Sequence, residues 1–461
     1  MLFYKGIIMV RKKKFALSPT HIILLSFLIT IFVGSLLLSL PISTKSGASV
    51  PYVDALFTAT TATCITGLVT LPTASTWSLF GQIVILVMIQ IGGVGVVTVI
   101  SGIMRIAHRK MGINDRLVIQ DAFNLNTMSG LAKFVKNVLL GTFIIEGIGA
   151  LLYMIAFVPK FGAKGIWISI FNSVSAFCNA GIDIIGENSL CDYATNPLVN
   201  AVSAALIVVG GIGFIVWWDL LRAIKMSSPK NRRFLRHLSL HSKIAISATL
   251  GLILVGGLLI FAFEYSNPLT IGNMGLFDKL QVSFFQSVTT RTAGFASVPQ
   301  ENLTNASTIL SLVLMSIGGS PVGTAGGIKT VTVAVLICSA FATIRNKKDT
   351  TLFGRRVANG SIRRAVAIVS CFFVICILAT LLLVATNDIS IADALYETVS
   401  GVATVGLSRN ITPSLNTFGK IIIIITMYLG RVGPISLAVA LGSKKNGQNI
   451  VTEPIEEISI G

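Results

Sequence analysis

One short pattern occurs four times along the chain, and its regular spacing constrains the fold more than any other feature. In residues 57–68 (FTATTATCITGL), an aromatic residue is followed ten residues later by a glycine and then by an apolar residue. The four copies begin at Phe57, Phe171, Phe284 and Tyr396 and contain Gly67, Gly181, Gly294 and Gly406. These glycines are 114, 113 and 112 residues apart. A fixed period indicates a repeat architecture, here of four repeats.

Two long apolar segments flank the glycine stretch in every repeat. They cover 21–40 and 77–104, 135–158 and 197–221, 243–263 and 306–344, and 364–386 and 418–442. Segments of about 20 residues are long enough to cross a bilayer, whereas the short segment between them is not. We therefore predict an all-α integral membrane fold with four tandem M1–P–M2 repeats, each made of a helix, a re-entrant pore helix and a helix. Eight transmembrane helices and four re-entrant pore helices then surround one pore with pseudo-four-fold symmetry.

The same segments predict the domain boundaries. We expect a tail at 1–20, repeats at 21–110, 133–225, 241–345 and 363–442, and a second tail at 443–461. Because each repeat contributes two spans, all four repeats enter the membrane from the same side. Their symmetry axis then lies along the membrane normal, unlike the inverted repeats of many secondary transporters.

Composition and charge placement assign the chain to membrane proteins. The chain is 53% hydrophobic and only 12% charged, which is unlike a soluble domain of this length. A net charge of +18 would suit a nucleic-acid partner, but 27 of the 36 Lys and Arg residues lie in the tails and between the repeats. That bias follows the positive-inside rule. We predict a multi-pass protein of the plasma (inner) membrane with cytoplasmic N- and C-termini and no nucleic-acid partner.

The glycine stretches then open to the outside, where acidic residues gather. They include Asp54, Asp183, Glu187, Asp278, Asp393 and Glu397. An acidic mouth raises the local concentration of cations. Ordinary solvation of a loop explains any one of these residues equally well.

The glycine stretches themselves are the candidate selectivity filter. Non-helical backbone at membrane depth is tolerated only where it lines a water-filled path or is buried in protein. Glycine permits positive φ, and rings of carbonyls replace the hydration shell of a cation. The candidate ion-binding residues are Thr63, Cys64, Ile65, Thr66 and Gly67; Cys178, Asn179, Ala180 and Gly181; Thr292, Ala293 and Gly294; and Ala403, Thr404, Val405 and Gly406. Four extracellular turns are the alternative, which the shared aromatic offset disfavours.

The four stretches are not identical. None contains a full TVGYG, so we expect fewer stacked ion sites than in a tetrameric potassium channel. The hydroxyls of Thr63, Thr66, Thr292 and Thr404 either add ligands or pack behind the backbone. Arg291 lies three residues before Gly294, and we expect it to point away from the ion path toward an acidic group, because a cation in the path would oppose flux.

The second apolar segment of each repeat contains a glycine cluster. In repeats one and two, we interpret these glycines as sites of tight helix packing. In repeat three, five glycines and Pro321 fall within 318–327, which no straight helix accommodates. We interpret 318–329 as a break below the filter, either a gate or a passive kink. The candidate gate residues are Gly318, Gly319, Ser320, Pro321, Gly323, Thr324, Gly326, Gly327, Lys329 and Arg431.

Two further charges lie at membrane depth. Arg431 occupies the place of a second glycine in repeat four. An intramembrane charge is a functional-site hypothesis by default, and we expect Arg431 to bond the carbonyls that the broken helix frees. Glu146 either pairs locally or lies near the interface.

Other classes of function fit the sequence less well. The run from Gly327 to Thr330 lacks the Gly-Lys-[Ser/Thr] order of a phosphate-binding loop. No convergent set of polar residues indicates an enzyme. A secondary transporter of another cation or solute, working by alternating access, remains the alternative. It is disfavoured because the repeats are not inverted and only one inner helix is visibly broken.

Taken together, these motifs resemble the Ktr/Trk/HKT superfamily of potassium transporters over about residues 20 to 442. The resemblance rests on the four repeats, the glycines Gly67, Gly181, Gly294 and Gly406, the broken third inner helix and Arg431. Within this superfamily, the chain is most similar to KtrB-type membrane subunits of bacterial Ktr systems.

The resemblance implies properties that the residues alone do not indicate. It implies potassium (K+) uptake, with sodium (Na+) stimulation and symport, through a pore subunit that binds no organic cofactor. It implies a homodimer in which each protomer has its own pore. It also implies a cytoplasmic ring of RCK-type nucleotide-binding subunits that controls the gate in trans.

Overall fold

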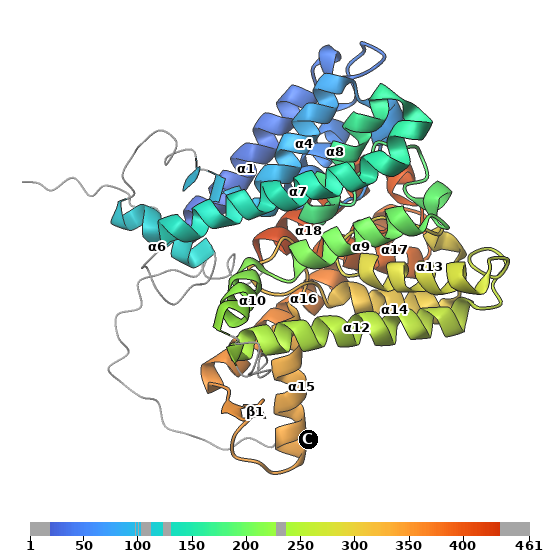
Figure 1. Cartoon of the computed structure of the whole chain (residues 1–461). Helices are drawn as coiled ribbons and strands as arrows, with labels where there is room; N and C mark the ends of the chain where they lie inside the picture. Colours follow the sequence, from blue (N-terminus) through green and yellow to red (C-terminus); the bar gives the residue numbers. More distant parts are fainter. Residues whose placement is uncertain are drawn as a thin grey trace, which may run out of the picture.

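The computed structural model of the chain describes residues 19–96, 98–99, 101–102, 112–122, 131–226 and 237–433. The predicted tail at 443–461 and residues 1–18 of the other tail lie outside these ranges. The described chain is a bundle of helices (Figure 1). One small departure from the all-α expectation is an antiparallel hairpin of β1 (Thr351–Leu352) and β2 (Arg355–Arg356).

Each repeat contributes three helices in the same order. The first helices are α1 (Pro19–Leu38), α7 (Leu131–Phe161), α12 (Leu240–Glu264) and α16 (Asn359–Thr386). The second helices are α2 (Tyr52–Cys64), α8 (Ala163–Cys178), α13 (Leu276–Thr289) and α17 (Ile391–Ala403). The third helices are α4 (Leu79–Val94), α9 (Pro197–Gly211), α14 (Asn305–Ser316) and α18 (Thr417–Val432).

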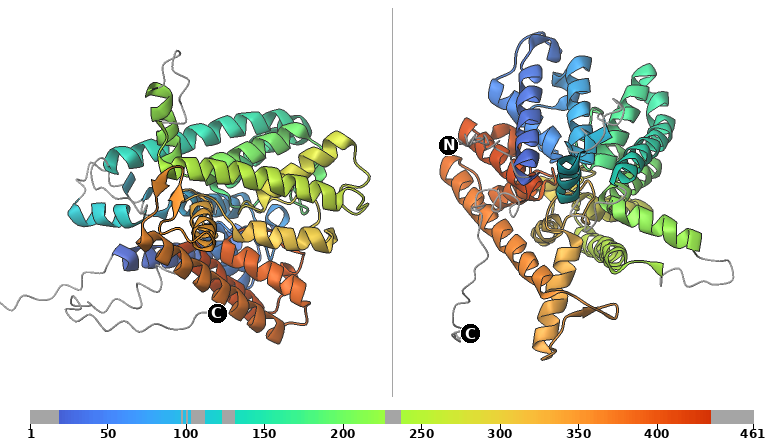
Figure 2. Two further views of the ribbon diagram at one scale, coloured as in Figure 1. Left: turned by 90° about the horizontal axis from the view of Figure 1, so that it is seen from below. Right: turned by 90° about the vertical axis from the view of Figure 1, so that its left-hand side faces the viewer.

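Shorter elements and continuations of the third helices complete the described chain. The short elements are α3 (Thr73–Thr76), α6 (Ile113–Ala122) and the 3₁₀ turns η1 (Pro41–Ser43), η2 (Cys191–Tyr193), η3 (Gln300–Asn302) and η4 (Thr412–Ser414). The continuations are α10 (Phe214–Met226), which follows α9, and α15 (Thr330–Ile344), which follows α14. Figure 2 shows α15 leaving the bundle between α12 and α16, both of which it contacts.

The repeats are packed in a closed circle. The third helix of each repeat contacts the second helix of the next: α4 contacts α8, α9 contacts α13, α14 contacts α17, and α18 contacts α2. Within each repeat, the first helix packs along the second. The last repeat therefore adjoins the first, which is the circular order that pseudo-four-fold symmetry requires.

Local sequence explains where the third helices begin and where the second helices end. The third helices begin after Ser78, Asn196, Thr304 and Asn416, whose side chains accept hydrogen bonds from backbone N–H groups in the first turn. Three second helices end at a left-handed residue, namely Ile65, Asn179 or Thr404. In these three repeats, the chain therefore turns sharply two residues before the repeated glycine.

Fewer helices than expected are long enough to span a membrane by themselves. Among the described residues, the four first helices meet the length and apolarity of a span, and α9 with α10 makes a fifth if that bent pair counts as one. The predicted continuous third segments are shorter in the structure because the helices end near glycines with positive φ: Gly95, Gly213 and Gly433. The α9–α10 pair bends by 94°. The expectation of a single broken inner helix is therefore wrong.

Candidate functional site

The four glycines of the repeated pattern meet at one point of the bundle. A Cβ atom built on Gly67 would lie 2.6 Å from the carbonyl oxygen of Ala180, the residue before Gly181. The same relation joins Gly181 to Ala293 and Gly294 to Val405, both at 2.6 Å, and Gly406 to Thr66, where the approach is closer still. We call this closed set of Gly67, Gly181, Gly294 and Gly406 the glycine ring.

Backbone conformation repeats around the glycine ring. All four glycines have positive φ, between 66° and 97°. Two residues before each glycine lies another residue with positive φ: Ile65, Asn179, Thr292 and Thr404. In an extended strand, neighbouring residues point to opposite sides, whereas a left-handed residue at every second position turns successive carbonyls toward one side. The same local backbone geometry therefore recurs in all four loops.

Hydroxyl groups at the ends of the second helices fix this backbone. Thr61 Oγ1 accepts a hydrogen bond from the Gly67 N–H at 2.9 Å, and Ser400 Oγ accepts one from the Gly406 N–H at 3.0 Å. The equivalent bonds are Ile182 N–H to Ser175 Oγ at 3.1 Å and Thr289 Oγ1 to the Phe295 carbonyl at 2.7 Å. None of these four hydroxyls is among the candidate ion-binding residues predicted from the sequence. Their fixed offset of five or six residues before each glycine was the available signal.

The threonine hydroxyls that the sequence predicts as possible ligands make no such hydrogen bonds. The side-chain oxygens of Thr63, Thr66, Thr292 and Thr404 are buried and have no hydrogen-bond partner among the described residues. They therefore do not hold the loops in place. Because a buried hydroxyl without a partner carries a desolvation penalty, these four oxygens are candidates to face an ion or water.

A funnel opens on one side of the glycine ring. Its cavity measures about 430 Å³, and its floor includes all four glycines of the ring. The short elements after each glycine, α3, η2, η3 and η4, contribute residues to its wall. Asp183, Glu187 and Glu301 are its acidic lining residues, and none of the lining residues, all in the described part of the chain, is basic. Burial raises the pKa of the Asp183 carboxyl to about 6.

Only two of the six acidic residues named from the sequence, Asp183 and Glu187, line this funnel. Asp54 pairs with Lys420 at 2.6 Å, and Asp393 pairs with Arg409 at 2.7 Å. Asp278 accepts a hydrogen bond from Gln281, and Glu397, fully buried, accepts hydrogen bonds from Ser408 and Thr412. Asp393 and Glu397 therefore hold the loop after Gly406, whereas Asp54 joins α2 to α18 and Asp278 bonds within α13.

The predicted interruption in repeat three coincides with residues 318–329, which we call the loop 318–329. Helix α14 ends at Ser316, and α15 begins at Thr330. The two ends of the loop are joined, because the Gly318 N–H donates to the Ile328 carbonyl at 2.9 Å and the Ile328 N–H donates to the Ser316 carbonyl at 3.1 Å. Lys329 Nζ donates back to the Ala325 carbonyl at 2.5 Å. The segment is therefore a closed loop with a narrow base.

The loop 318–329 lies against the face of the glycine ring opposite the funnel. Thr324 Oγ1 is hydrogen-bonded to the side-chain amide of Asn179 at 3.1 Å and donates to the Phe177 carbonyl at 3.2 Å. A Cβ atom on Gly326 would collide with Thr404 Oγ1. The loop thus touches the left-handed residues of two repeats, on the face of the ring that points away from the funnel.

A second broken helix satisfies the backbone of this loop. The Ser320 N–H donates to the Gly211 carbonyl at 2.9 Å, and the Thr324 N–H donates to the Gly210 carbonyl at 3.2 Å. In return, the Phe214 N–H donates to the Val322 carbonyl at 2.9 Å. Buried backbone groups need partners, so the two interruptions complete each other. The predicted tight packing is also present, because a Cβ on Gly210 would overlap the Phe177 carbonyl, as one on Gly92 would overlap that of Thr63.

Arg431 makes the contacts that the sequence predicts. Its Nη1 donates to the Thr324 carbonyl in the loop 318–329 at 2.6 Å. Its Nη2 donates to the Gly92 carbonyl near the end of α4 at 2.5 Å. One guanidinium from repeat four therefore joins repeat one to the middle of the loop.

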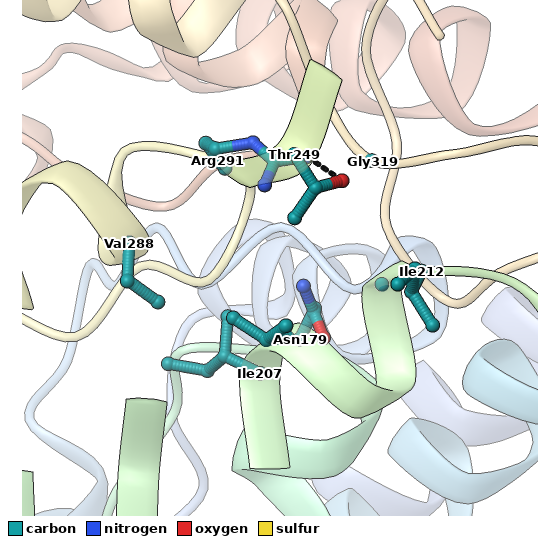
Figure 3. A pocket seen from close by; sticks show the side chains of 9 residues that line it. Asn179, Ile207, Ile212, Thr249, Val288, Arg291 and Gly319 are labelled. Atoms are coloured by element: carbon teal, nitrogen blue, oxygen red, sulfur yellow. Dashed lines mark hydrogen bonds between the residues drawn. The ribbon is translucent and has the colours of Figure 1, made fainter. Parts of the chain in front are cut away.

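Arg291 does not meet the acidic group that we expected from the sequence. No described acidic residue forms an ion pair with it. Its Nη2 instead lies 3.4 Å from Thr249 Oγ1 on α12 and 3.3 Å from the Gly318 carbonyl. Figure 3 shows Arg291, Thr249, Asn179 and Gly319 around a cavity of about 10 Å³, which has room for one water molecule. The carbonyl that the end of α14 frees takes the place of the expected carboxylate.

Glu146 pairs locally, which decides between the two alternatives left by the sequence. Its carboxylate accepts a hydrogen bond from Gln90 Nε2 on α4 at 3.2 Å. The Cys178 Sγ, at the end of α8, lies 3.8 Å from both Glu146 and Gln90. Glu146 is only 5% exposed, so it joins three helices beside a candidate filter residue.

A helical membrane bundle with four loops on one axis, and an acidic funnel above them, defines the class of multi-pass membrane proteins that transport cations. The sequence profile of the TrkH family, described as "Cation transport protein", matches residues 12–450. The chain belongs to the TrkH family. Members of this family are transport proteins, in line with the expectation that the chain is not an enzyme.

Known relatives cover nearly the whole chain. The potassium/sodium uptake protein NtpJ of Enterococcus hirae is 38% identical over 98% of this chain and 100% of its own length. The Ktr system potassium uptake protein B of Bacillus subtilis is 38% identical over 96% of this chain and 97% of its own. The crystal structure of the potassium transporter TrkH from Vibrio parahaemolyticus aligns with a TM-score of 0.75 at 16% identity, covering 94% of this chain and 87% of that one. At that identity, the likeness concerns the fold.

Proposed function

We propose that this chain is the ion-translocating subunit of a Ktr-like potassium-uptake system in the plasma membrane. The observation that supports this most directly is the glycine ring, to which each repeat of one chain contributes backbone. Carbonyl rings are the means by which proteins replace the hydration shell of potassium. Two relatives that match nearly the whole chain are named for potassium uptake.

In this proposal, the loops that end at the glycine ring form the selectivity filter. Ions enter from the funnel, where Asp183, Glu187 and Glu301 attract cations. Backbone carbonyls then coordinate the ion, and the buried hydroxyls of Thr63, Thr66, Thr292 and Thr404 are available next to them. The hydroxyls of Thr61 and Ser400 hold the loops at a fixed spacing, which favours discrimination between ions of different size.

The loop 318–329 is the gate in this proposal. It lies across the path on the side of the glycine ring opposite the funnel. Its backbone is held by the Gly210 and Gly211 carbonyls and by Arg431, so opening requires these hydrogen bonds to break as well as the apolar contacts of Val322 and Ile328. A small number of such bonds suits a segment that has to move.

The remaining parts of the proposal concern assembly and regulation. The Bacillus subtilis relative is named as a protein of a Ktr system, and we propose that this chain likewise works with a cytoplasmic ring of RCK-type nucleotide-binding subunits. We further propose a homodimer, cytoplasmic termini and stimulation of potassium uptake by sodium. The basic residues between the repeats then face the cytoplasm.

The first test is rubidium uptake into proteoliposomes that contain this chain alone. Wild type is compared with a deletion of 320–326, with excess sodium as competitor and protein-free liposomes as the control. We expect uptake that resists sodium competition and that rises on deletion, because the deletion removes the loop from the path. No uptake by either protein would contradict a pore that functions without its partner, and equal uptake by both would contradict the gate.

A second candidate function is supported by one observation. Two third helices are broken in the middle, at Gly213 and at the loop 318–329, and broken helices are frequent in secondary transporters with alternating access. Electrical recordings in planar bilayers separate the two functions. Discrete unitary currents support the pore, whereas flux without unitary currents that shows counterflow supports alternating access.

A further inference from the structure

The position three residues before each ring glycine differs among the repeats in one respect. Repeats one, two and four have Cys64, Cys178 and Ala403 there, and repeat three has Arg291. Repeat three is also the repeat whose third helix is interrupted by a long loop, between α14 and α15. The distinctive side chain and the distinctive interruption therefore occur in the same quarter of the bundle.

Arg291 connects these two features directly. It immediately precedes Thr292, a left-handed residue next to the glycine ring. Its guanidinium reaches the carbonyl of Gly318, the first residue of the loop 318–329, at 3.3 Å. The Gly318 N–H is in turn bonded to the Ile328 carbonyl at the other end of the loop. One side chain thus links the ring to the narrow base of the loop.

The charge of Arg291 makes this link sensitive to movement of the loop. The side chain is only 6% exposed, and no described carboxylate pairs with it. A buried charge is costly unless it is hydrogen-bonded, and the Gly318 carbonyl is its nearest acceptor. A shift of the loop base leaves the guanidinium with Thr249 alone, at 3.4 Å (Figure 3).

We propose that Arg291 is a positioning residue that couples the glycine ring to the loop 318–329. The inference extends the proposed function, and its transport measurement rests on that function. Displacing the loop base removes the acceptor of Arg291 and so releases the backbone at Thr292, Ala293 and Gly294. Arg431 holds the middle of the same loop from repeat four, so the two arginines act at different points, and only Arg291 belongs to a ring-forming loop.

Hydrogen–deuterium exchange of the full chain in lipid nanodiscs tests the coupling without reference to transport. In Arg291→Met, we expect exchange to accelerate both in 292–296 and in 318–322. A hydrogen bond to a charged group corresponds to an acceleration of about tenfold to a hundredfold. Thr249→Val is the matched control, because it removes the other contact of Arg291 and leaves the Gly318 bond intact. It is expected to change exchange in either segment by less than about threefold.

Arg291→Lys keeps the charge but replaces the forked guanidinium with a single ammonium group on a shorter side chain. It is expected to show an intermediate acceleration of exchange in both segments. If Arg291→Met does not fold, the exchange rates of Arg291→Lys are compared with those of Thr249→Val instead. The inference is overturned if the arginine variants exchange like wild type, or if only one of the two segments accelerates. In rubidium uptake, the arginine variants are expected to lose sodium discrimination and to leak in the absence of the partner. If wild type does not transport at all, a pore that functions without its partner is contradicted, while the exchange result still decides the coupling.

Discussion

Replacing Gly181 by alanine perturbs the glycine ring at a site where both nearest neighbours are backbone atoms. A Cβ at this position would lie 2.6 Å from the Ala293 oxygen and 2.7 Å from the Gly294 Cα, where ordinary contacts are 3.4–4 Å. Both neighbours are backbone atoms, so no side chain can rotate away. The Ala293 carbonyl must move by about 0.8 Å. The left-handed φ of 66° adds strain of about 1–3 kcal/mol for a residue with a side chain.

The displaced carbonyl enlarges or tilts one quarter of the ring, so the expected loss falls on ion discrimination. We expect the preference for rubidium over sodium in proteoliposomes to fall by about tenfold or more, which corresponds to ~1.4 kcal/mol. Gly186→Ala is the matched control, because Gly186 lines the same funnel and a Cβ there meets nothing within 4 Å. A melting curve in detergent separates misfolding from altered selectivity. A folded Gly181→Ala protein with wild-type discrimination would refute the ring as the filter.

Three other perturbations act on neighbouring features. Burial raises the pKa of Asp183 to about 6, so its carboxyl is ionised above that pH and neutral below it. Uptake at low potassium concentration should therefore decline as pH falls through 6. Asp183→Asn should show lower uptake that does not change with pH over this range. Ser400→Ala leaves the Gly406 N–H without its acceptor, and calorimetry should show a loss of about 1–3 kcal/mol in stability, whereas an unchanged melting temperature would contradict that role. Arg431→Met removes the hydrogen bonds to the Thr324 and Gly92 carbonyls and should accelerate uptake into proteoliposomes that contain this chain alone. Equal rates in mutant and wild type would contradict this role of Arg431.

The circular arrangement was predictable because it depends on single residues with strict backbone roles. Each ring glycine has positive φ and a neighbour in contact with the place of its Cβ, so one residue type is required at one period. The interruption at 318–329 was predictable for a similar reason, since Pro321 and five glycines exclude a continuous helix. Such constraints are local and can be read from one chain.

Features that depend on a distant partner could not be predicted in this way. The bend at Gly213 resembles ordinary glycine packing in the sequence. Only the N–H groups of Ser320 and Thr324, which donate to the Gly211 and Gly210 carbonyls, explain how α9 can end there with its carbonyls satisfied. Arg291 was expected to seek a carboxylate, because the sequence does not reveal that α14 ends beside it. Hydropathy likewise overestimated the length of the third helices, since it measures apolarity and is insensitive to where a backbone turns.

The closed circle has a consequence for how the protein is made. Gly406 in the last repeat abuts Thr66 in the first, and Tyr428 on α18 donates to the carbonyl of Leu24, 404 residues earlier in the chain. During synthesis, the loop of repeat one enters the membrane long before its neighbour on that side exists. Because polar backbone in lipid requires a partner, this loop must wait for α18 in an incomplete state. We expect assembly to be completed only when the last described helix docks, so chains that end before α18 should be preferred targets of membrane proteases.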